Sequence, residues 1–349
     1  MANLTYHEQK DIENIKRLRQ LIKELPPFCA DFFRGIEPRT STRTRIAYAY
    51  DLRIFFEFLR TNNSAVAAMG DNVPLSILEQ LTVTDLEEYL EYLKCHPSII
   101  GEDVINTERG IMRKASSLKS FYNYYFRNER IEKNPAALLR NPKLHEKEII
   151  RLEIDEVAKL LDQVEEGDKL TDKQKIYHER TKVRDLAMMS LLLGTGIRVS
   201  ECVGLNINDV DLDTCGIKIY RKGGKEAVVY FSDEVRDVLE KYMEEREMID
   251  AYPGHEEAFF LSMQRKRMNV RSVENLVKKY SRLVTPLKKI TPHKLRSTYG
   301  TSLYRETGDI YLVASVLGHN DVNTTRKHYA AQEDERRRSA RNVVKLRED

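Results

Sequence analysis

The chain has 349 residues, more than one domain of ordinary size usually holds, so two domains are expected. Hydrophobic residues make up 41% and charged residues 32% of the sequence, which argues for folded domains and against an intrinsically disordered chain. No apolar run approaches the ~20 residues of a membrane-spanning helix, and the polar first residues lack the apolar core of a signal peptide. These features exclude an integral membrane protein and predict a cytoplasmic one.

Four cysteines, Cys29, Cys95, Cys202 and Cys215, are scattered along the chain without any Cys-x-x-Cys spacing. In a cytoplasmic protein such cysteines are expected to be reduced core residues, because that compartment disfavours disulfides. The sequence also has no nucleotide-binding loop. We therefore expect no zinc site, no other metal and no cofactor.

Apolar residues recur at helical spacing in several segments of the N-terminal part. A short pattern within residues 1–36 is stopped by a pair of prolines. A stronger pattern runs from Ser41 to about Arg60, Thr84 is expected to cap the next helix, and a further helix is expected at about 106–128.

Asn-Pro pairs at 134–135 and 141–142 interrupt this pattern, and a charged stretch follows them. The first part of the chain is therefore expected to hold an N-terminal helical extension at 1–36, a helical bundle at 37–140 and a linker at 141–152.

The second part of the chain combines helices with one hairpin. Gly223 and Gly224 lie between two β-rich runs, where a Gly-Gly pair favours a two-residue turn. The other expected elements are helices that begin near 155 and 179 and helices at about 233–250, 271–283, 292–306 and 309–317. The fold class is thus mainly α, with the helical bundle followed by a mostly helical domain at 153–331, which has a small antiparallel sheet, and a tail at 332–349.

One segment of the second part is strongly basic. Residues 262 to 296 include eleven basic residues and a single acidic one, Glu274, although the net charge of the whole chain is only +3. Helix surfaces in solution usually mix the two signs, so a stretch of one sign indicates an anionic partner such as nucleic acid.

Two short motifs pair a cationic side chain with a second polar group. Arg198 follows a glycine break, and Glu201 lies one helical turn later, where its carboxylate can orient the guanidinium. His293 and Arg296 are three residues apart, on one helix face and close to a helix start that favours anions.

A third motif follows a helix that Gly318 is expected to end. His319 comes directly after the glycine, and Tyr329 comes ten residues later. Each motif alone has an ordinary explanation, as surface pairs or as a core tyrosine. Only their joint occurrence indicates a site.

The joint pattern resembles the tyrosine recombinases, the family that includes lambda-type integrases and Xer recombinases, and the resemblance covers nearly the whole chain. It implies a mainly α fold and an enzyme that cleaves and rejoins DNA through a 3′-phosphotyrosyl intermediate, without a cofactor. The residues that carry the resemblance, in chain order, are Arg198, Lys222, His293, Arg296, His319 and Tyr329.

The resemblance also implies roles for these residues. Tyr329 would be the nucleophile, and Arg198, supported by Glu201, would bind the scissile phosphate together with Arg296. Planar guanidinium groups suit the nonbridging oxygens of a phosphate.

The remaining roles concern protons. His293 and His319 would hydrogen-bond the phosphate, and His293 is the better candidate to accept the tyrosine proton. Lys222 matches the family's lysine general acid, with Lys225 as its local competitor.

Two positions depart from the family pattern. The spacing from histidine to tyrosine is ten residues, where nine is commoner, so His328 occupies the usual tyrosine position. Ser297 stands where many members have a second histidine after the arginine.

The segments around residues 44–52 and 113–121 resemble the core-binding domain of the same family. The aromatic run at 121–126 is dense enough to indicate packing inside the bundle rather than base stacking. The residues expected to contact DNA are Arg43, Thr44, Arg45, Arg113, Lys114 and Lys119.

The partners that the resemblance implies are double-stranded DNA with a specific recombination site and three further copies of the chain. Family members work as tetramers that exchange C-terminal segments. Xer-type resolution of chromosome dimers and integration or excision of a mobile element both stay open. So do relaxation of DNA by a type IB topoisomerase-like activity and a catalytically silent DNA-binding regulator. A metal nuclease is disfavoured, because no carboxylate cluster accompanies the histidines.

Overall fold

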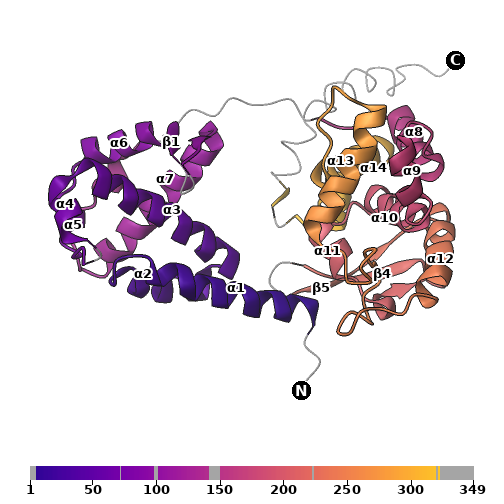
Figure 1. The fold of residues 1–349 in the computed structure, drawn as a ribbon, viewed down its shortest axis with the longest axis horizontal. Coiled ribbons are helices and arrows are strands. Elements are labelled where there is room, and N and C mark those ends of the chain that lie inside the picture. Colours follow the sequence, from indigo (N-terminus) through magenta and orange to yellow (C-terminus); the bar gives the residue numbers. More distant parts are fainter. Residues whose placement is uncertain are drawn as a thin grey trace, which may run out of the picture. The chain divides into compact units, whose positions relative to one another are not determined.

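The computed structural model describes residues 5–70, 72–97, 101–140, 150–221, 224–319 and 321–322. The chain divides into two compact units, Met1–Lys147 and Glu148–Asp349. In Figure 1 the first unit runs from indigo to purple and the second from magenta to yellow. No helix within the described ranges is long and apolar enough to cross a membrane.

The described part of the N-terminal unit is helical apart from one short hairpin. Its elements are α1 (Tyr6–Lys23), α2 (Cys29–Gly35), η1 (Glu37–Arg39), α3 (Thr42–Asn62), α4 (Ser64–Met69), α5 (Ile77–Gln80), α6 (Val83–Tyr92), β1 (Cys95–Pro97), β2 (Asp103–Ile105), α7 (Glu108–Arg127) and η2 (Pro135–Leu138).

Side-chain caps fix where these helices begin. The Ser41 hydroxyl accepts a hydrogen bond from a backbone N–H in the first turn of α3, so this helix begins where its pattern predicts. The expectation that Thr84 caps the next helix is wrong, because α6 begins after Thr82. Thr82 and Asp85 exchange side-chain-to-backbone hydrogen bonds, which satisfy two backbone N–H groups at once.

Aromatic side chains form the centre of this unit's core. The ring of Phe121 on α7 packs edge-on against Phe32 on α2, with 5.1 Å between ring centroids, and against Tyr125 at 5.3 Å. The aromatic run of α7 therefore packs inside the bundle, as the sequence predicts. Leu18 of α1 is buried in the same core, and α1 lies along α3, so residues from the first 36 are part of this bundle.

An ion pair between the buried Asp51 and the exposed Arg113 ties α3 to α7. Asp51 is 2% exposed and accepts two hydrogen bonds from the Arg113 guanidinium, at 2.5 and 2.6 Å. Burial raises the pKa of the Asp51 carboxyl, and the hydrogen bonds and positive charge of Arg113 partly offset this rise. The bidentate geometry fixes the two helices in register.

The C-terminal unit surrounds one central helix. Its described elements are α8 (Ile154–Glu166), α9 (Asp172–His178), α10 (Lys182–Thr195), α11 (Val199–Gly204), η3 (Ile207–Asp209), β3 (Val210–Asp211), β4 (Gly216–Tyr220), β5 (Glu226–Tyr230), α12 (Asp233–Glu247), α13 (Val270–Val284), α14 (Pro292–Thr307) and α15 (Ile310–Leu317). The central helix, α10, contacts α8, α11, α12 and α14, and its residues 187–193 are all buried.

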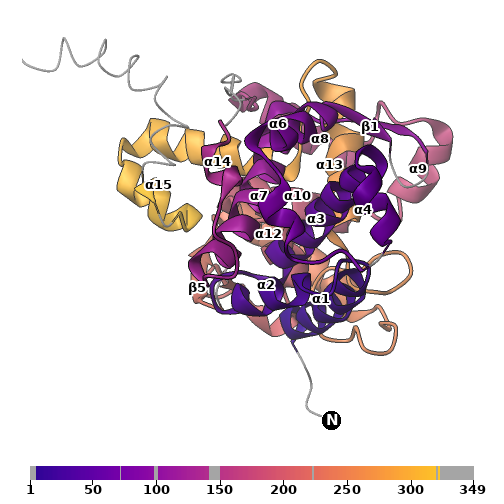
Figure 2. The same ribbon diagram turned by 90° about the vertical axis from the view of Figure 1, so that its left-hand side faces the viewer.

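The strands form an antiparallel sheet in the order β3-β4-β5. The expected hairpin is confirmed, because β4 and β5 pair up to Tyr220 and Glu226 at its closed end. The expected two-residue turn is wrong, because three residues of the sequence lie between Arg221 and Lys225, which are joined by a backbone hydrogen bond. The helices expected at the C-terminal end of this unit are also present, and Figure 2 shows α15 beside α14, which it contacts. The short helix α9 was not expected from the sequence.

The four cysteines are free, and Cys29 and Cys202 are buried as expected. Cys95 is exposed at the start of β1, so the expectation of a core position is wrong there. Within the described part of the chain, no group of three or more His, Cys, Asp or Glu residues could hold a metal ion.

The ion pair of Asp51 and Arg113 leads to a prediction for stability. Arg113→Ala is expected to lower the free energy of unfolding of the N-terminal unit by about 2–3 kcal/mol, because the Asp51 carboxylate stays buried without its partner. Urea denaturation of the full chain measures the loss, and hydrogen exchange at α3 and α7 amides assigns it to this unit. Arg43→Ala, at an exposed position of α3, is the control. Wild-type stability of Arg113→Ala would contradict the structural role of the ion pair.

Candidate active site

Arg198 occupies the turn between α10 and α11. Gly196 ends α10 with φ of +63°, a conformation that favours glycine, and Arg198 is the residue before α11. Its Nη1 donates to Glu201 Oε1 at 2.8 Å, and its backbone N–H donates to Glu201 Oε2 at 2.7 Å. The expected orientation of this guanidinium by Glu201 is therefore present. The arginine side chain is 40% exposed, whereas the glutamate is buried.

Arg296 lies inside the unit, on α14. It is 5% exposed, and its guanidinium donates from Nη1 to the carbonyl of Gly196 at 2.7 Å and from Nη2 to the carbonyl of Leu317. One side chain thus joins the turn before Arg198 to the end of α15. Five N–H donors in a planar fork make arginine suited to such a bridge, which the single ammonium of lysine cannot copy.

His319 emerges from the end of α15. Gly318 follows the helix in a left-handed conformation, and the backbone N–H of His319 returns to the carbonyl of Ala314 at 2.9 Å. Arg198 Nη2 donates to the carbonyl of Gly318 at 3.4 Å. The structure therefore brings Arg198, Arg296 and His319 to one helix end.

His293 lies at the other edge of this arrangement. It is the second residue of α14, exposed, and three residues before the buried Arg296 on the same helix. Thr291 precedes the helix and Pro292 opens it, as the sequence predicts.

Two of the expected catalytic residues, Lys222 and Tyr329, lie outside the described residues. The hairpin turn is described on both sides of Lys222, where the backbone N–H of Arg221 donates to the carbonyl of Lys225 at 2.8 Å. Lys225 is exposed.

The residues expected to contact DNA differ in what they touch. On α3, Arg43 is exposed, Thr44 shares a hydroxyl hydrogen bond with Ser41 at 2.9 Å, and Arg45 forms an ion pair with Glu37 at 3.4 Å. Of these residues Arg43 carries an exposed positive charge at the start of α3. Contact of these three residues with DNA stays a prediction.

On α7 the expected DNA contacts are held by the protein itself. Arg113 is bonded to Asp51, and Lys119 Nζ donates to the carbonyl of Leu139 at 2.7 Å. Lys114 is buried, with 7% of the residue exposed. All three side chains contribute to the bundle, so a role in DNA binding for them also stays a prediction.

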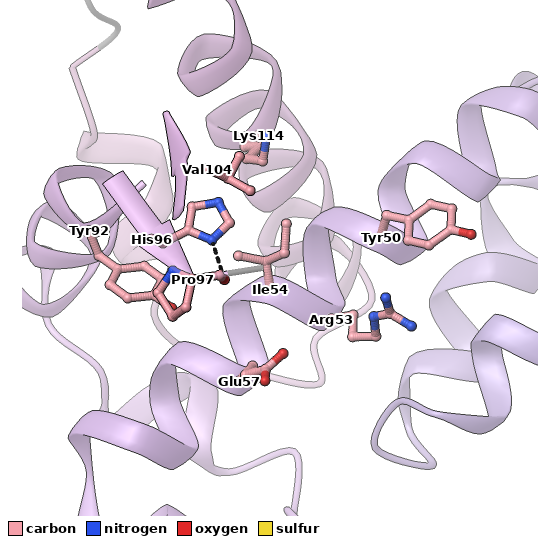
Figure 3. Close-up of a pocket in the computed structure, with 9 residues that line it drawn as sticks. All are labelled: Tyr50, Arg53, Ile54, Glu57, Tyr92, His96, Pro97, Val104 and Lys114. Carbon is pink, nitrogen blue, oxygen red and sulfur yellow. Dashed lines mark hydrogen bonds between the residues drawn. The ribbon is translucent and has the colours of Figure 1, made fainter. Parts of the chain in front are cut away.

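A cavity of about 320 Å³ in the N-terminal unit holds none of the expected catalytic residues. It lies between α3, α6, α7 and the β1–β2 hairpin, and its walls are largely apolar and aromatic, as Figure 3 shows. The His96 Nδ1 group that lines it donates to the carbonyl of Pro97 at 3.0 Å, and Lys114 donates to Asn106 at 2.7 Å. Both of these groups are thus engaged within the unit, whereas the buried Nε2 of His96 has no hydrogen-bond partner among the described residues there.

Arg221 also contacts this helix end, although its sequence pattern did not predict a site residue. Its guanidinium donates to the carbonyls of Ser315 and Val316, at 3.2 and 2.6 Å, so it belongs to the same helix end as Arg198 and Arg296. The one sequence feature that pointed to Arg221 is its position next to Lys222. That position does not predict a contact with α15.

The fold and this cluster of cations at one helix end define a class of mostly helical proteins with a site suited to an anion. Two guanidiniums and an imidazole close together suit a phosphate or a phosphodiester.

Comparison with known proteins identifies the family. Residues 151–336 match the phage integrase family. The chain is 32% identical to the tyrosine recombinase XerC of Caldanaerobacter subterraneus, over 93% of this chain and 88% of that protein. It is 31% identical to the tyrosine recombinase XerS of Lactococcus lactis, over 90% and 93%.

Solved structures agree on the fold. XerH bound to a palindromic difH substrate has a TM-score of 0.64 at 18% identity, over 86% of this chain and 79% of that one. A lambda integrase dimer bound to a core site has a TM-score of 0.61 at 16% identity, over 86% and 94%. The chain therefore belongs to the phage integrase family of tyrosine recombinases, and it is a DNA strand transferase that carries out site-specific recombination.

The bridge made by Arg296 leads to a second prediction. Arg296→Lys is expected to lower the free energy of unfolding of the C-terminal unit by about 1–3 kcal/mol, because one buried carbonyl loses its donor. Thermal unfolding of the full chain measures the change. Arg305→Lys, on the same helix with 40% of its side chain exposed, is the matched control. Equal stability of the two variants would contradict the bridging role.

Proposed function

We propose that the chain cuts a DNA strand by attack of the Tyr329 hydroxyl on a phosphodiester held by Arg198 and Arg296. The observation that supports this most is the convergence of the two guanidiniums on neighbouring carbonyls at the end of α15. Attack by an oxygen concentrates negative charge on the nonbridging oxygens of the phosphate. Preorganised donors that meet this charge are worth several kcal/mol of barrier lowering.

The two arginines contribute in different ways. Arg198 is partly exposed and is held by Glu201 on one side, so its outward N–H groups can donate to a nonbridging oxygen. Arg296 is buried and supplies a fixed positive charge from within the unit. His319, directly after the helix end, donates to the same phosphate.

Proton transfers complete the step. A phenol with an ordinary pKa of about 10 is a weak nucleophile at neutral pH, so Tyr329 needs a base, and His293 at the exposed start of α14 takes the proton. As the bond from tyrosine oxygen to phosphorus forms, the bond to the 5′ oxygen breaks. Lys222 protonates that departing oxygen, with Lys225 as the alternative donor.

The phosphotyrosyl link retains the energy of the broken bond. A 5′ hydroxyl from a second strand can therefore attack it, release the tyrosine and reseal the DNA without a nucleotide cofactor. We assign the exchange to four copies of the chain on paired double-stranded DNA sites in the cytoplasm, with C-terminal segments passed between neighbours.

The relatives favour a Xer-type role over that of a mobile-element integrase. Relatives that are 30–32% identical over most of this chain include tyrosine recombinases named XerC and XerS. We therefore assign the chain to resolution at one chromosomal site by copies of itself.

A single experiment tests the nucleophile. The purified chain, mixed with sheared DNA of its source organism and then denatured, is expected to carry covalently bound DNA, whose sequence reveals the recombination site. Tyr329→Phe is expected to abolish the adduct, because it removes the attacking oxygen, whereas Tyr311→Phe, at an exposed position of α15, keeps it. An adduct formed by Tyr329→Phe would disprove the assignment. Adducts gathered at the ends of a mobile element would contradict the Xer-type role.

A further inference from the structure

The hairpin turn begins with an arginine that has no role in the mechanism above. Arg221 follows β4, and its guanidinium donates from Nη1 to the carbonyl of Ser315 and from Nη2 to that of Val316. Both carbonyls lie in the last turn of α15, 94 and 95 residues further along the chain. The side chain thus ties the end of the central strand, β4, to the end of a helix.

With these bonds, each of the last carbonyls at this helix end has an arginine donor. Arg296 donates to Leu317 and Arg198 to Gly318, so four successive carbonyls, from 315 to 318, each accept a hydrogen bond from an arginine. The last carbonyls of a helix lack partners within the helix and carry partial negative charge, so cations there are favourable. His319 is the residue directly after these four carbonyl groups.

Arg221 also shares the charge environment of Arg198. Burial lowers the pKa of the Arg221 guanidinium, the Glu201 carboxylate opposes this, and the positive charge of Arg198 lowers it further. The guanidinium packs directly against Gly318, where a Cβ would overlap it. Gly318 has φ of +61°, so the turn and the close approach of Arg221 both require glycine.

We propose that Arg221 is a positioning residue for strand transfer, which fixes the end of α15 and thereby the imidazole of His319. The proposal rests on the function assigned above to His319. Arg221 acts through the backbone carbonyls of α15, and Arg198 and His319 make the contacts to the phosphate.

Single-turnover cleavage tests the assignment, with a nicked duplex of the site recovered from the covalent adducts as the probe. Arg221→Gln is expected to slow adduct formation about 10- to 100-fold, since small displacements of a reacting group have effects of this size, while the Kd for DNA changes less than about two-fold. Arg221→Lys keeps the charge and is expected to recover part of the rate. Arg236→Gln, on α12 with partners Asp233 and Asp237, is the matched control and is expected to react like wild type.

A double variant separates positioning from a general loss of structure. If Arg221 works through His319, Arg221→Gln combined with His319→Gln is no slower than the slower single variant, because the same contribution is lost once. If the rate losses of the two single variants multiply in the double variant, the proposal is overturned. An unchanged cleavage rate for Arg221→Gln would also overturn it, as would a variant that loses only affinity for DNA. Thermal unfolding checks each variant, and Arg221→Lys replaces the glutamine variant in the cycle if the latter unfolds. Absence of an adduct in the wild-type chain would overturn the proposed function itself, and this proposal with it.

Discussion

The structure of the candidate site depends on how the end of α15 is satisfied. A helix that ends inside a protein leaves carbonyl groups that need donors, and here arginine side chains supply them. The buried Arg296 is central, because it bonds the carbonyl before the turn of Arg198 and the carbonyl near His319 at the same time. One side chain therefore helps to fix the positions of both Arg198 and His319.

The same arrangement prepares the pocket for an anion. Several guanidiniums at one helix end repel each other, and Glu201 and the helix carbonyls only partly offset this repulsion. In the proposed mechanism, a DNA phosphate adds negative charge beside donors that are already in place. Little reorganisation is then needed as charge develops during strand cleavage.

Local features of this site could be predicted from the sequence, and long-range ones could not. Helical spacing and glycine breaks are enough to predict the contact between Arg198 and Glu201. They are also enough to predict where α15 ends. Whether a basic residue faces solvent or a carbonyl depends on packing between distant segments. Arg267, from the strongly basic stretch, bonds the carbonyls of Val203 and Leu205, and Lys114 is buried. For this reason, the number of basic residues in a stretch of sequence overestimates the charged surface that is free to contact DNA.

The central claim is that Arg198 neutralises charge on the scissile phosphate, and a neutral substrate tests it most directly. A duplex whose scissile phosphate is replaced by methylphosphonate lacks that charge. Loss of the guanidinium in Arg198→Ala should slow cleavage of the normal duplex by about 10²- to 10³-fold, the usual cost of one such donor. The same variant should cleave the methylphosphonate duplex at close to the wild-type rate. Equal losses on both duplexes would contradict the account.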